Sequence, residues 1–138
     1  MKNTKGSIYA IIDNETFEVY IGSTVQSIKR RYGKHMTDMR MYLGLSDRPR
    51  CYRSSFDILI RDNYKVICIH EFHNINNHKD LKLFESLYML KFKKQGVKVI
   101  NGCISNKEAR VLDWRNFGLK EIDFSAKTLF KNRPLLLQ

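Results

Sequence analysis

Residues 7–24 read SIYAIIDNETFEVYIGST, and this stretch decides the fold. It contains two β-rich runs, residues 7–12 and residues 17–22, in which Ile, Val, Tyr and Phe predominate. The polar cluster of residues 13–16 between them suits a hairpin turn. We therefore expect the chain to begin with a β-hairpin.

The second run also indicates which side chains face the core. Successive side chains of a strand point to opposite faces of the sheet. Phe17, Val19 and Ile21 share one face and are the core candidates. Tyr20 is expected on the opposite face.

An amphipathic helix is expected after the hairpin. Apolar residues recur every three or four positions over residues 25–43, which is the period of a helix with one buried face. Arg31 and His35 are four residues apart and share one flank of this helix. Gly33 lies inside it at a cost of about 1 kcal/mol relative to alanine. The glycine favours the close approach of a backbone or a ligand.

The middle of the chain predicts a short helix near residues 52–62 and a third strand over residues 64–72. Strict alternation places one set of strand side chains on one face, namely Tyr64, Val66, Cys68, His70 and Phe72. The other face then carries Lys65, Ile67, Ile69 and Glu71. We expect this strand to be buried on both faces at its centre.

A long helix is expected over residues 78–95, with Gly96 at the position that follows the last helical residue. Its apolar stripe is well defined, and Glu85 falls on the border of that stripe. Residues 97–101 are predicted to form a further short extended segment.

Length and composition bound the architecture. With 138 residues, 43% of them apolar, the chain has room for one main domain and a short appendage. We predict a domain over residues 1–104 and an extension over residues 105–138 that is helical and packed on the domain. Ser105 and Glu108 fit the capping-box pattern at the start of a helix in that extension.

Several classes of protein are excluded or disfavoured. The three cysteines lack the spacing of zinc ligands, which argues against a structural zinc site. No apolar run reaches the roughly 18 residues needed to cross a bilayer, and the first residues do not resemble a secretory signal. We expect an intracellular protein that is not secreted and has no membrane partner. The P-loop, dinucleotide-binding, zinc-protease and α/β-hydrolase motifs are absent from the sequence.

Charge gives the first functional indication. The 25 Lys and Arg residues against 14 Asp and Glu leave a net charge of +11, and a field of that sign favours polyanions. Basic residues gather between positions 29 and 53, namely Lys29, Arg30, Arg31, Lys34, Arg40, Arg48, Arg50 and Arg53. Such a run is also typical of a solvated face that binds nothing.

A set of separated motifs adds a specific indication. In chain order these are the tripeptides Ser7-Ile8-Tyr9 and Tyr20-Ile21-Gly22, then Arg31-x-x-x-His35, Glu85 and Asn101. In order and spacing they resemble the GIY-YIG nuclease family, and the resemblance covers residues 6 to about 102. Ser7 stands where the first motif of the family has glycine. Because serine is small, the strand should tolerate it.

The resemblance implies both a fold and an activity. The fold is α/β, of the α+β kind: a small three-stranded antiparallel sheet flanked by helices. The activity is that of a metal-dependent DNA endonuclease that leaves 5′-phosphate and 3′-hydroxyl ends, as a stand-alone catalytic domain of the homing-endonuclease, phage or viral type. The low alanine content beside abundant Asn, Lys and Ile also favours a phage, virus or mobile element.

The chemistry of phosphodiester hydrolysis explains these residue types. A water molecule must lose a proton, and negative charge must be stabilised on the phosphate and on the departing oxygen. Glu85 would bind Mg²⁺ or Mn²⁺, hard cations that need only one or two carboxylates. Arg31 would hold the scissile phosphate with its planar donor fork. Tyr9 would activate the water, which requires its pKa to fall from about 10 under the influence of Arg31, His35 and the metal.

The remaining motif residues would support that step. Tyr20 would orient the water or relay its proton, and His35 would accept a proton from a tyrosine. Asn101 would hold the active-site backbone or hydrogen-bond a phosphate oxygen. Contacts with the nucleic acid are expected from Lys29, Arg30, Lys34, Arg40, Arg48, Arg50 and Arg53.

Alternatives remain open at this point. The chain could be a non-catalytic nucleic-acid-binding module of the same fold, or its substrate could be structured RNA or a branched junction. Glu85 could instead pair with Lys82 or Lys91, and His35 could be a packing residue. Aromatic residues of the extension could stack on nucleotides, although capping the core is favoured for Trp114, Phe117 and Phe130. A single site cuts one strand per event, so the sequence leaves monomer and homodimer both open.

Overall fold

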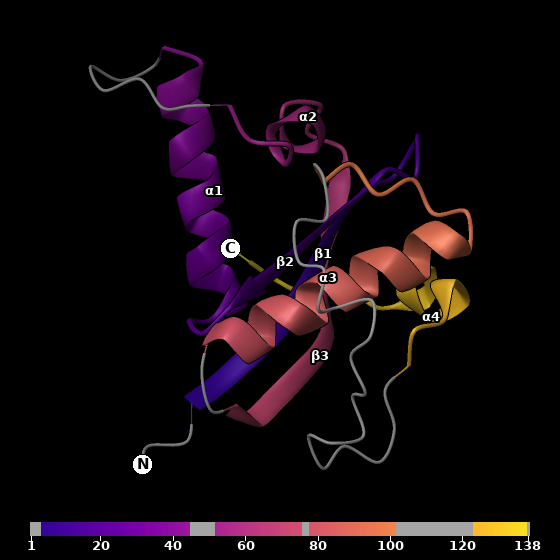
Figure 1. The fold of residues 1–138 in the computed structure, drawn as a ribbon. Coiled ribbons are helices and arrows are strands. Elements are labelled where there is room, and N and C mark those ends of the chain that lie inside the picture. The colour runs from indigo at the N-terminus through magenta and orange to yellow at the C-terminus, as the bar shows by residue number, and fades with distance from the viewer. Residues whose placement is uncertain (1–3, 45–51, 76–77, 102–122, 138) are drawn as a thin grey trace.

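The computed structural model describes residues 4–44, 52–75, 78–101 and 123–137. Its centre is a three-stranded antiparallel sheet with the strand order β2-β1-β3 (Figure 1). The strands are β1 (Thr4–Asp13), β2 (Val19–Thr24) and β3 (Tyr64–Ile75). The structure confirms both the opening hairpin and the α+β fold class.

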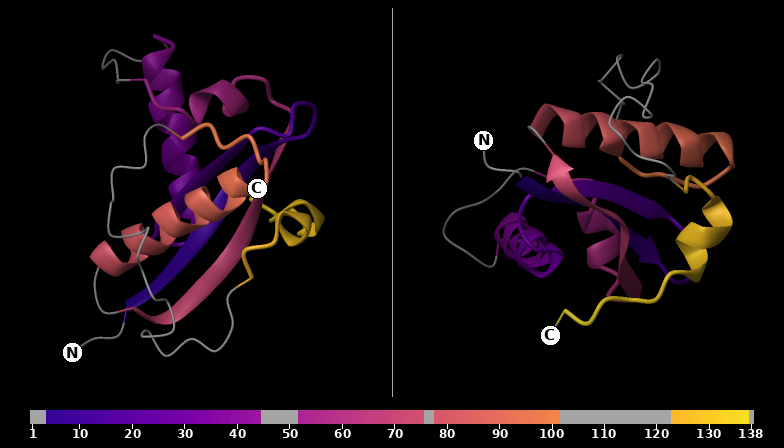
Figure 2. Two further views of the ribbon diagram at one scale, coloured as in Figure 1. Left: turned by 45° about the vertical axis from the view of Figure 1, so that its right-hand side comes forward. Right: turned by 90° about the horizontal axis from the view of Figure 1, so that it is seen from below.

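Within the described residues, four helices surround the sheet: α1 (Ile28–Tyr42), α2 (Phe56–Leu59), α3 (His78–Lys94) and α4 (Ala126–Lys131). The view from below in Figure 2 shows α3 on one face of the sheet and both α1 and α2 on the other. In the ranges that the structure describes, no helix has both the length and the apolar composition needed to cross a bilayer.

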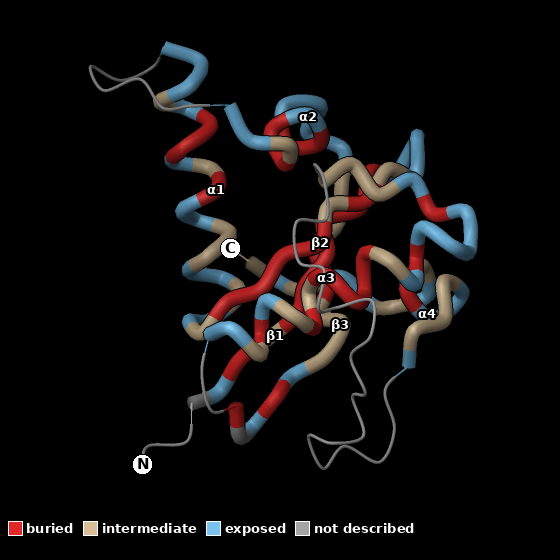
Figure 3. The backbone as a smooth tube through the Cα atoms, viewed as in Figure 1, coloured by how far each residue is buried: buried red, intermediate tan, exposed pale blue. Residues whose placement is uncertain are grey.

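The central strand β1 is buried on both faces, and the described residues form two apolar clusters. The α3-face cluster is formed by Ile8, Ala10, Ile12, Val19, Ile21, Ile67, Phe72, Ile75, Leu81, Phe84, Leu87, Tyr88, Met89, Phe92, Val97 and Leu129. The α1-face cluster is formed by Tyr9, Ile11, Met39, Phe56, Ile58, Leu59 and Val66. Figure 3 shows that burial is greatest along β1 and β2, whereas much of α1 is exposed. Each cluster takes alternate side chains of β1, as the strand period requires.

The hairpin turn is longer than the sequence pattern indicates. Asp13 accepts hydrogen bonds from the backbone N–H groups of Glu15 and Thr16, at 2.8 and 2.9 Å. Phe17 then adopts a left-handed φ of 59°, and its side chain is 58% exposed. The prediction that Phe17 lies in the core is therefore wrong, because the turn extends through this residue and β2 begins only at Val19.

A β-bulge also changes the faces of the third strand. Ile8 pairs with His70, but the next residue of β1 pairs with Cys68, so one residue of β3 is left over. Val66 consequently belongs to the α1-face cluster and Phe72 to the α3-face cluster. The prediction that these two side chains share a face is wrong, because an extra residue reverses the alternation beyond it.

The helix ends follow local signals in the sequence. The Ser27 side chain accepts a hydrogen bond from the N–H of Arg30 at 3.1 Å and so caps the start of α1. Gly96, which follows α3, has a φ of +86°, a conformation that glycine adopts without strain. The predicted end of the long helix at Gly96 is thereby confirmed.

The segment after α3 lies beside the sheet. Val19 forms a parallel bridge with Val99, and its N–H donates to the carbonyl of Lys98 at 2.8 Å. The predicted extended segment therefore flanks β2. The expected helix at Ser105 and the aromatic residues Trp114 and Phe117 lie outside the described residues.

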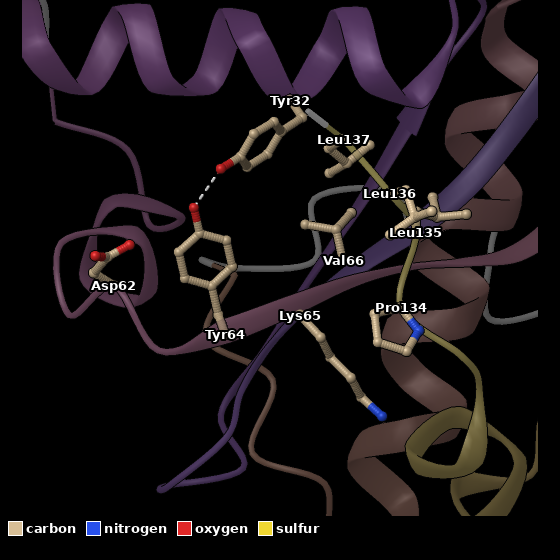
Figure 4. Close-up of a pocket in the computed structure, with 9 residues that line it drawn as sticks. All are labelled: Tyr32, Asp62, Tyr64, Lys65, Val66, Pro134, Leu135, Leu136 and Leu137. Carbon is tan, nitrogen blue, oxygen red and sulfur yellow. Dashed lines mark hydrogen bonds between the residues drawn. The ribbon is translucent and has the colours of Figure 1, made fainter.

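The C-terminal segment contacts the end of α3 at Phe124 and Ala126 and then runs along β3 from Phe130. The Lys65 ammonium donates to the carbonyls of Phe130 and Asn132 at 2.8 and 3.2 Å, and the N–H of Leu135 donates to the carbonyl of Val66 at 2.8 Å. A cavity of about 450 Å³ lies under this segment (Figure 4). Two hydrogen-bonded tyrosines and three leucines line most of it: Tyr32, Tyr64, Leu135, Leu136 and Leu137.

Candidate active site

The α1 face of the sheet brings two tyrosines and a histidine together. Tyr9 on β1 and His35 on α1 are each 1% exposed, and the Tyr9 hydroxyl lies 2.7 Å from His35 Nε2. The ring of Tyr20 on β2 packs edge-on against the His35 ring, with centroids 5.4 Å apart. Residues separated by up to 26 positions in the chain thus form one cluster at the sheet surface.

Gly22 is required by the close packing of this cluster. Tyr9 and Gly22 are paired across the two strands, and the Tyr9 ring lies over the glycine. A Cβ atom added at Gly22 would lie 2.3 Å from Cζ and 2.4 Å from the hydroxyl oxygen of Tyr9, well inside the range of real contacts. The last residue of the Tyr-Ile-Gly motif therefore makes room for the phenol of the first motif.

The surroundings of Tyr9 favour the protonated phenol. Burial raises the pKa of Tyr9 well above its ordinary value, and the neighbouring Tyr20 and Glu85 raise it further. Arg31 acts in the opposite direction, chiefly through its charge, but does not outweigh burial. Arg31 therefore acts in the expected direction, but the protein side chains alone leave the pKa of Tyr9 raised, because the phenol is almost completely removed from water.

His35 is neutral in this environment. Burial and the charges of Arg31 and Arg53 lower its pKa to about 4, despite the opposing charge of Asp38. Its Nε2 atom faces Tyr9, and its Nδ1 atom lies 3.0 Å from the hydroxyl of Ser55. A neutral imidazole has one nitrogen that can accept a proton, as the predicted role of His35 requires.

Glu85 projects from α3 toward the end of β2. It accepts a hydrogen bond from the Ser23 hydroxyl at 3.2 Å, and its charge raises the pKa of both Tyr9 and Tyr20. Lys82, one turn earlier on α3, lies 3.6 Å from its second oxygen. The acid thus lies within electrostatic reach of the hairpin tyrosines, and it also makes the lysine pairing that the sequence left open.

The donor set suits a hard divalent cation. Glu85 offers a carboxylate that is 16% exposed, and Mg²⁺ typically binds one or two carboxylates while keeping several waters. Within the described residues, no group of three or more His, Cys, Asp or Glu side chains could enclose a metal. A site of this composition favours Mg²⁺ or Mn²⁺ over zinc.

Asn101 supports the strand that carries Tyr20. Its side-chain amide donates to the carbonyl of Ile21 at 2.7 Å and accepts from the N–H of Ile21 at 2.8 Å. Both polar atoms of the side chain therefore bind the backbone between Tyr20 and Gly22. Of the two roles expected for Asn101, this geometry favours holding the backbone.

The predicted nucleic-acid contacts lie mainly on α1. The exposed basic residues of this helix are Lys29, Arg30, Lys34 and Arg40. Arg53 precedes α2, and its Nε atom lies 3.8 Å from the buried carboxylate of Asp38. Arg48 and Arg50 lie outside the described residues.

Sequence reasoning missed two polar supports and one ion pair. Ser23 and Ser55 contact Glu85 and His35, and Asp38 holds Arg53 near the site. Serine is common and gives no pattern of its own, so Ser55, which is 20 residues from His35, left no signal in the sequence. Asp38 lies one turn after His35 on α1, and that spacing could have indicated it.

Comparison with known proteins assigns the family. A model described as the GIY-YIG catalytic domain matches residues 5–101. The chain belongs to the GIY-YIG family, whose catalytic domain is a nuclease.

The chain is also 32% identical over 131 residues to "Uncharacterized protein 019R" of Invertebrate iridescent virus 6. The match covers 94% of this chain but only 42% of the viral protein. No solved structure gives a significant match.

Proposed function

We propose that this protein is a metal-dependent endonuclease that hydrolyses DNA phosphodiester bonds and leaves 5′-phosphate and 3′-hydroxyl ends. The observation that carries the proposal is the convergence of Tyr9, Tyr20 and His35 on one surface, with the charges of Arg31 and Glu85 acting on the same phenols. Those are the groups that proton removal, phosphate binding and charge neutralisation require.

Electrostatics support a nucleic-acid substrate. The net charge of +11 attracts a polyanion, and the exposed cations of α1 extend from the same helix that carries Arg31 and His35. DNA bound along this helix would place a phosphate near the Arg31 guanidinium. Binding of this kind should weaken with salt, with a log-log slope of about −0.9 per phosphate neutralised on duplex DNA.

The protonation states favour a relay rather than a free tyrosinate. Tyr9 is protonated, and its hydroxyl faces the Nε2 atom of the neutral His35 ring. As the attacking water forms its bond to phosphorus and the bond to the 3′ oxygen breaks, the water proton passes to Tyr9 while the phenol proton passes to His35. The departing 3′ oxygen takes a proton from solvent and becomes the 3′-hydroxyl. Burial of both groups keeps bulk water out of this path.

The other residues align the reactants. Arg31 would hold the nonbridging oxygens of the phosphate, and Tyr20 would orient the water. Asn101 would keep Tyr20 and Gly22 in position through its two bonds to Ile21. A divalent cation held by Glu85 would neutralise charge on the phosphate and on the departing oxygen.

Cleavage of a supercoiled plasmid tests the proposal directly. The wild-type protein should nick the plasmid with Mg²⁺ or Mn²⁺ and should lose the activity in EDTA. Glu85→Gln should abolish nicking but still retard labelled DNA in a gel at the same salt concentration. Glu15→Gln, which changes an exposed acid of the hairpin turn, is the matched control and should cleave normally.

Two outcomes would count against the proposal. Metal-dependent nicking by Glu85→Gln would refute the role of this acid. Tight binding by the wild-type protein without any cleavage would favour the non-catalytic module. Resealing of the nicks by DNA ligase would support the expected ends, because ligase joins only a 5′-phosphate to a 3′-hydroxyl.

A viral setting is supported by the similarity to the iridescent-virus protein. The chain spans less than half of that protein, so the activity and partners of the whole viral protein give no direct guide to those of this chain. Cleavage assays with labelled duplex, flap, junction and RNA oligonucleotides would rank the substrates. Size-exclusion chromatography with light scattering would distinguish a monomer from a homodimer.

A further inference from the structure

Ser55 lies at the start of α2 but does not stabilise that helix with its side chain. Serine in this position usually caps a helix by accepting a backbone hydrogen bond. Here the Ser55 side chain makes no capping bond, and its backbone is helical, with φ −59° and ψ −25°. The residue is completely buried, and its hydroxyl lies 3.0 Å from His35 Nδ1.

Two hydroxyls and one imidazole form a hydrogen-bonded chain. Ser55 Oγ faces Nδ1 of His35, and Nε2 of the same ring faces the Tyr9 hydroxyl at 2.7 Å. Because a neutral imidazole carries one N–H, one of these two bonds is donated by the ring and the other is accepted by it. The tautomer of His35 decides which way the chain runs.

The protonated state of Tyr9 favours one direction at this contact. Burial keeps the phenol protonated, so Tyr9 has a hydroxyl proton to donate, and an imidazole nitrogen is a better hydrogen-bond acceptor than a phenol oxygen. When the Tyr9 hydroxyl donates to Nε2, the ring proton lies on Nδ1, where Ser55 Oγ can accept it.

We propose that Ser55 is a positioning residue whose hydroxyl holds His35 in the Nδ1–H tautomer, leaving Nε2 free to take the Tyr9 proton. Its catalytic consequence rests on the proposed nuclease function, whereas the tautomer itself does not. The hydrogen bond at one ring nitrogen generally sets the state of the other. Without an acceptor at Nδ1, the ring proton can occupy Nε2, and Tyr9 then meets a donor instead of an acceptor.

Nitrogen-15 NMR of the full chain reads the tautomer directly. Long-range proton–nitrogen correlations at pH 7 distinguish a protonated Nδ1 from a protonated Nε2, and His35 is assigned by the signal missing from His35→Gln. The wild-type protein should show Nδ1–H and an unprotonated Nε2. Detection of Nε2–H in the wild-type protein would overturn the proposal. This measurement needs no Ser55 variant.

The variants test the role of the hydroxyl. Ser55→Ala should shift His35 toward Nε2–H, whereas Ser55→Thr, which keeps the hydroxyl, should preserve Nδ1–H. Ser86→Ala removes a different buried serine, on α3, and should leave the His35 signals unchanged. An unchanged tautomer in folded Ser55→Ala would contradict the proposal.

Kinetics connect the tautomer with cleavage. In Ser55→Ala we expect kcat to fall about tenfold, with little change in KM for DNA, and Ser55→Thr should restore it. A shifted tautomer with unaltered kcat would overturn the positioning role. The expected tautomer in a wild-type protein that cleaves nothing would support the Ser55 assignment while refuting the nuclease function, so the two failures are distinguishable.

Discussion

The two faces of the sheet bury different kinds of side chain. The α3-face cluster is almost entirely hydrocarbon, and its Tyr88 hydroxyl is buried without a hydrogen-bond partner in the described part of the chain. The α1 face buries His35, Ser55 and Asp38 beside its apolar residues, and each of these side chains has a polar partner.

This difference separates stability from chemistry. Apolar burial stabilises in proportion to area and tolerates some variation, whereas buried polar groups must each find a partner in a fixed geometry. The central strand β1 contributes to both, because alternate residues such as Ile8 and Tyr9 face opposite clusters. Substitutions on the two faces should therefore have different consequences for stability and for cleavage.

The largest expected effect is on cleavage, from Tyr9→Phe. This change removes the hydroxyl that links the attacking water to His35 and should lower the single-turnover cleavage rate about 10³-fold, or about 4 kcal/mol. Stability should fall only by about 1 to 2 kcal/mol, because Nε2 of His35 loses its partner. Tyr32→Phe, whose hydroxyl bonds Tyr64 on the same face, is the matched control. Equal rates in the two variants would rule out the relay.

Leu129→Ala, on the α3 face, should lower stability and leave cleavage unchanged. Leu129 on α4 is 2% exposed and packs in the α3-face cluster, so its truncation should cost about 3 kcal/mol of unfolding free energy. Urea unfolding measures the loss, and cleavage by the folded protein should remain normal. Lys127→Ala, at an exposed position of the same helix, should leave stability nearly unchanged. A Leu129→Ala protein as stable as the wild type would show that the extension adds little to the core.

Acid should weaken the α1 face specifically. His35 has a pKa of about 4 in the folded protein against an ordinary value of 6.5, because burial, Arg31 and Arg53 disfavour its charged form. The unfolded chain therefore binds a proton more readily, and stability is lost as pH falls from about 6.5 toward 4. Between pH 7 and pH 5 the loss should be about 2 kcal/mol. His35→Gln should remove that part of the slope in urea titrations, and an unchanged slope would contradict it.

Much of the fold follows from local sequence patterns. Side-chain period and capping residues, which act over a few positions, set the hairpin, the two long helices and the end of α3 at Gly96. The errors at Phe17 and along β3 arise where one residue too many enters a turn or a strand. An insertion of this kind depends on pairing between distant segments, and the side-chain period of a single strand does not report it.

The candidate site divides in a similar way. Tyr9, Tyr20, Arg31 and His35 could be proposed from motif spacing, and the structure brings them together. Their protonation could not be foreseen, since the pKa of a buried phenol depends on how completely the fold excludes water. Ser55 was equally inaccessible, because it meets His35 only through the packing of α2 against α1.

The smallest predicted effect concerns the exposed side of α1, where a glycine interrupts the helix. Among the residues that the structure describes, a Cβ atom at Gly33 would meet nothing within 4 Å, so none of their backbones requires the glycine. Gly33→Ala should raise the unfolding free energy by about 1 kcal/mol through helix propensity alone. Gly44→Ala is the informative control, because its Cβ also meets nothing in the described part of the chain but its φ is +80°, where alanine is strained. Urea unfolding should therefore move the two variants in opposite directions, and destabilisation by both would mean that Gly33 is needed for a reason other than space.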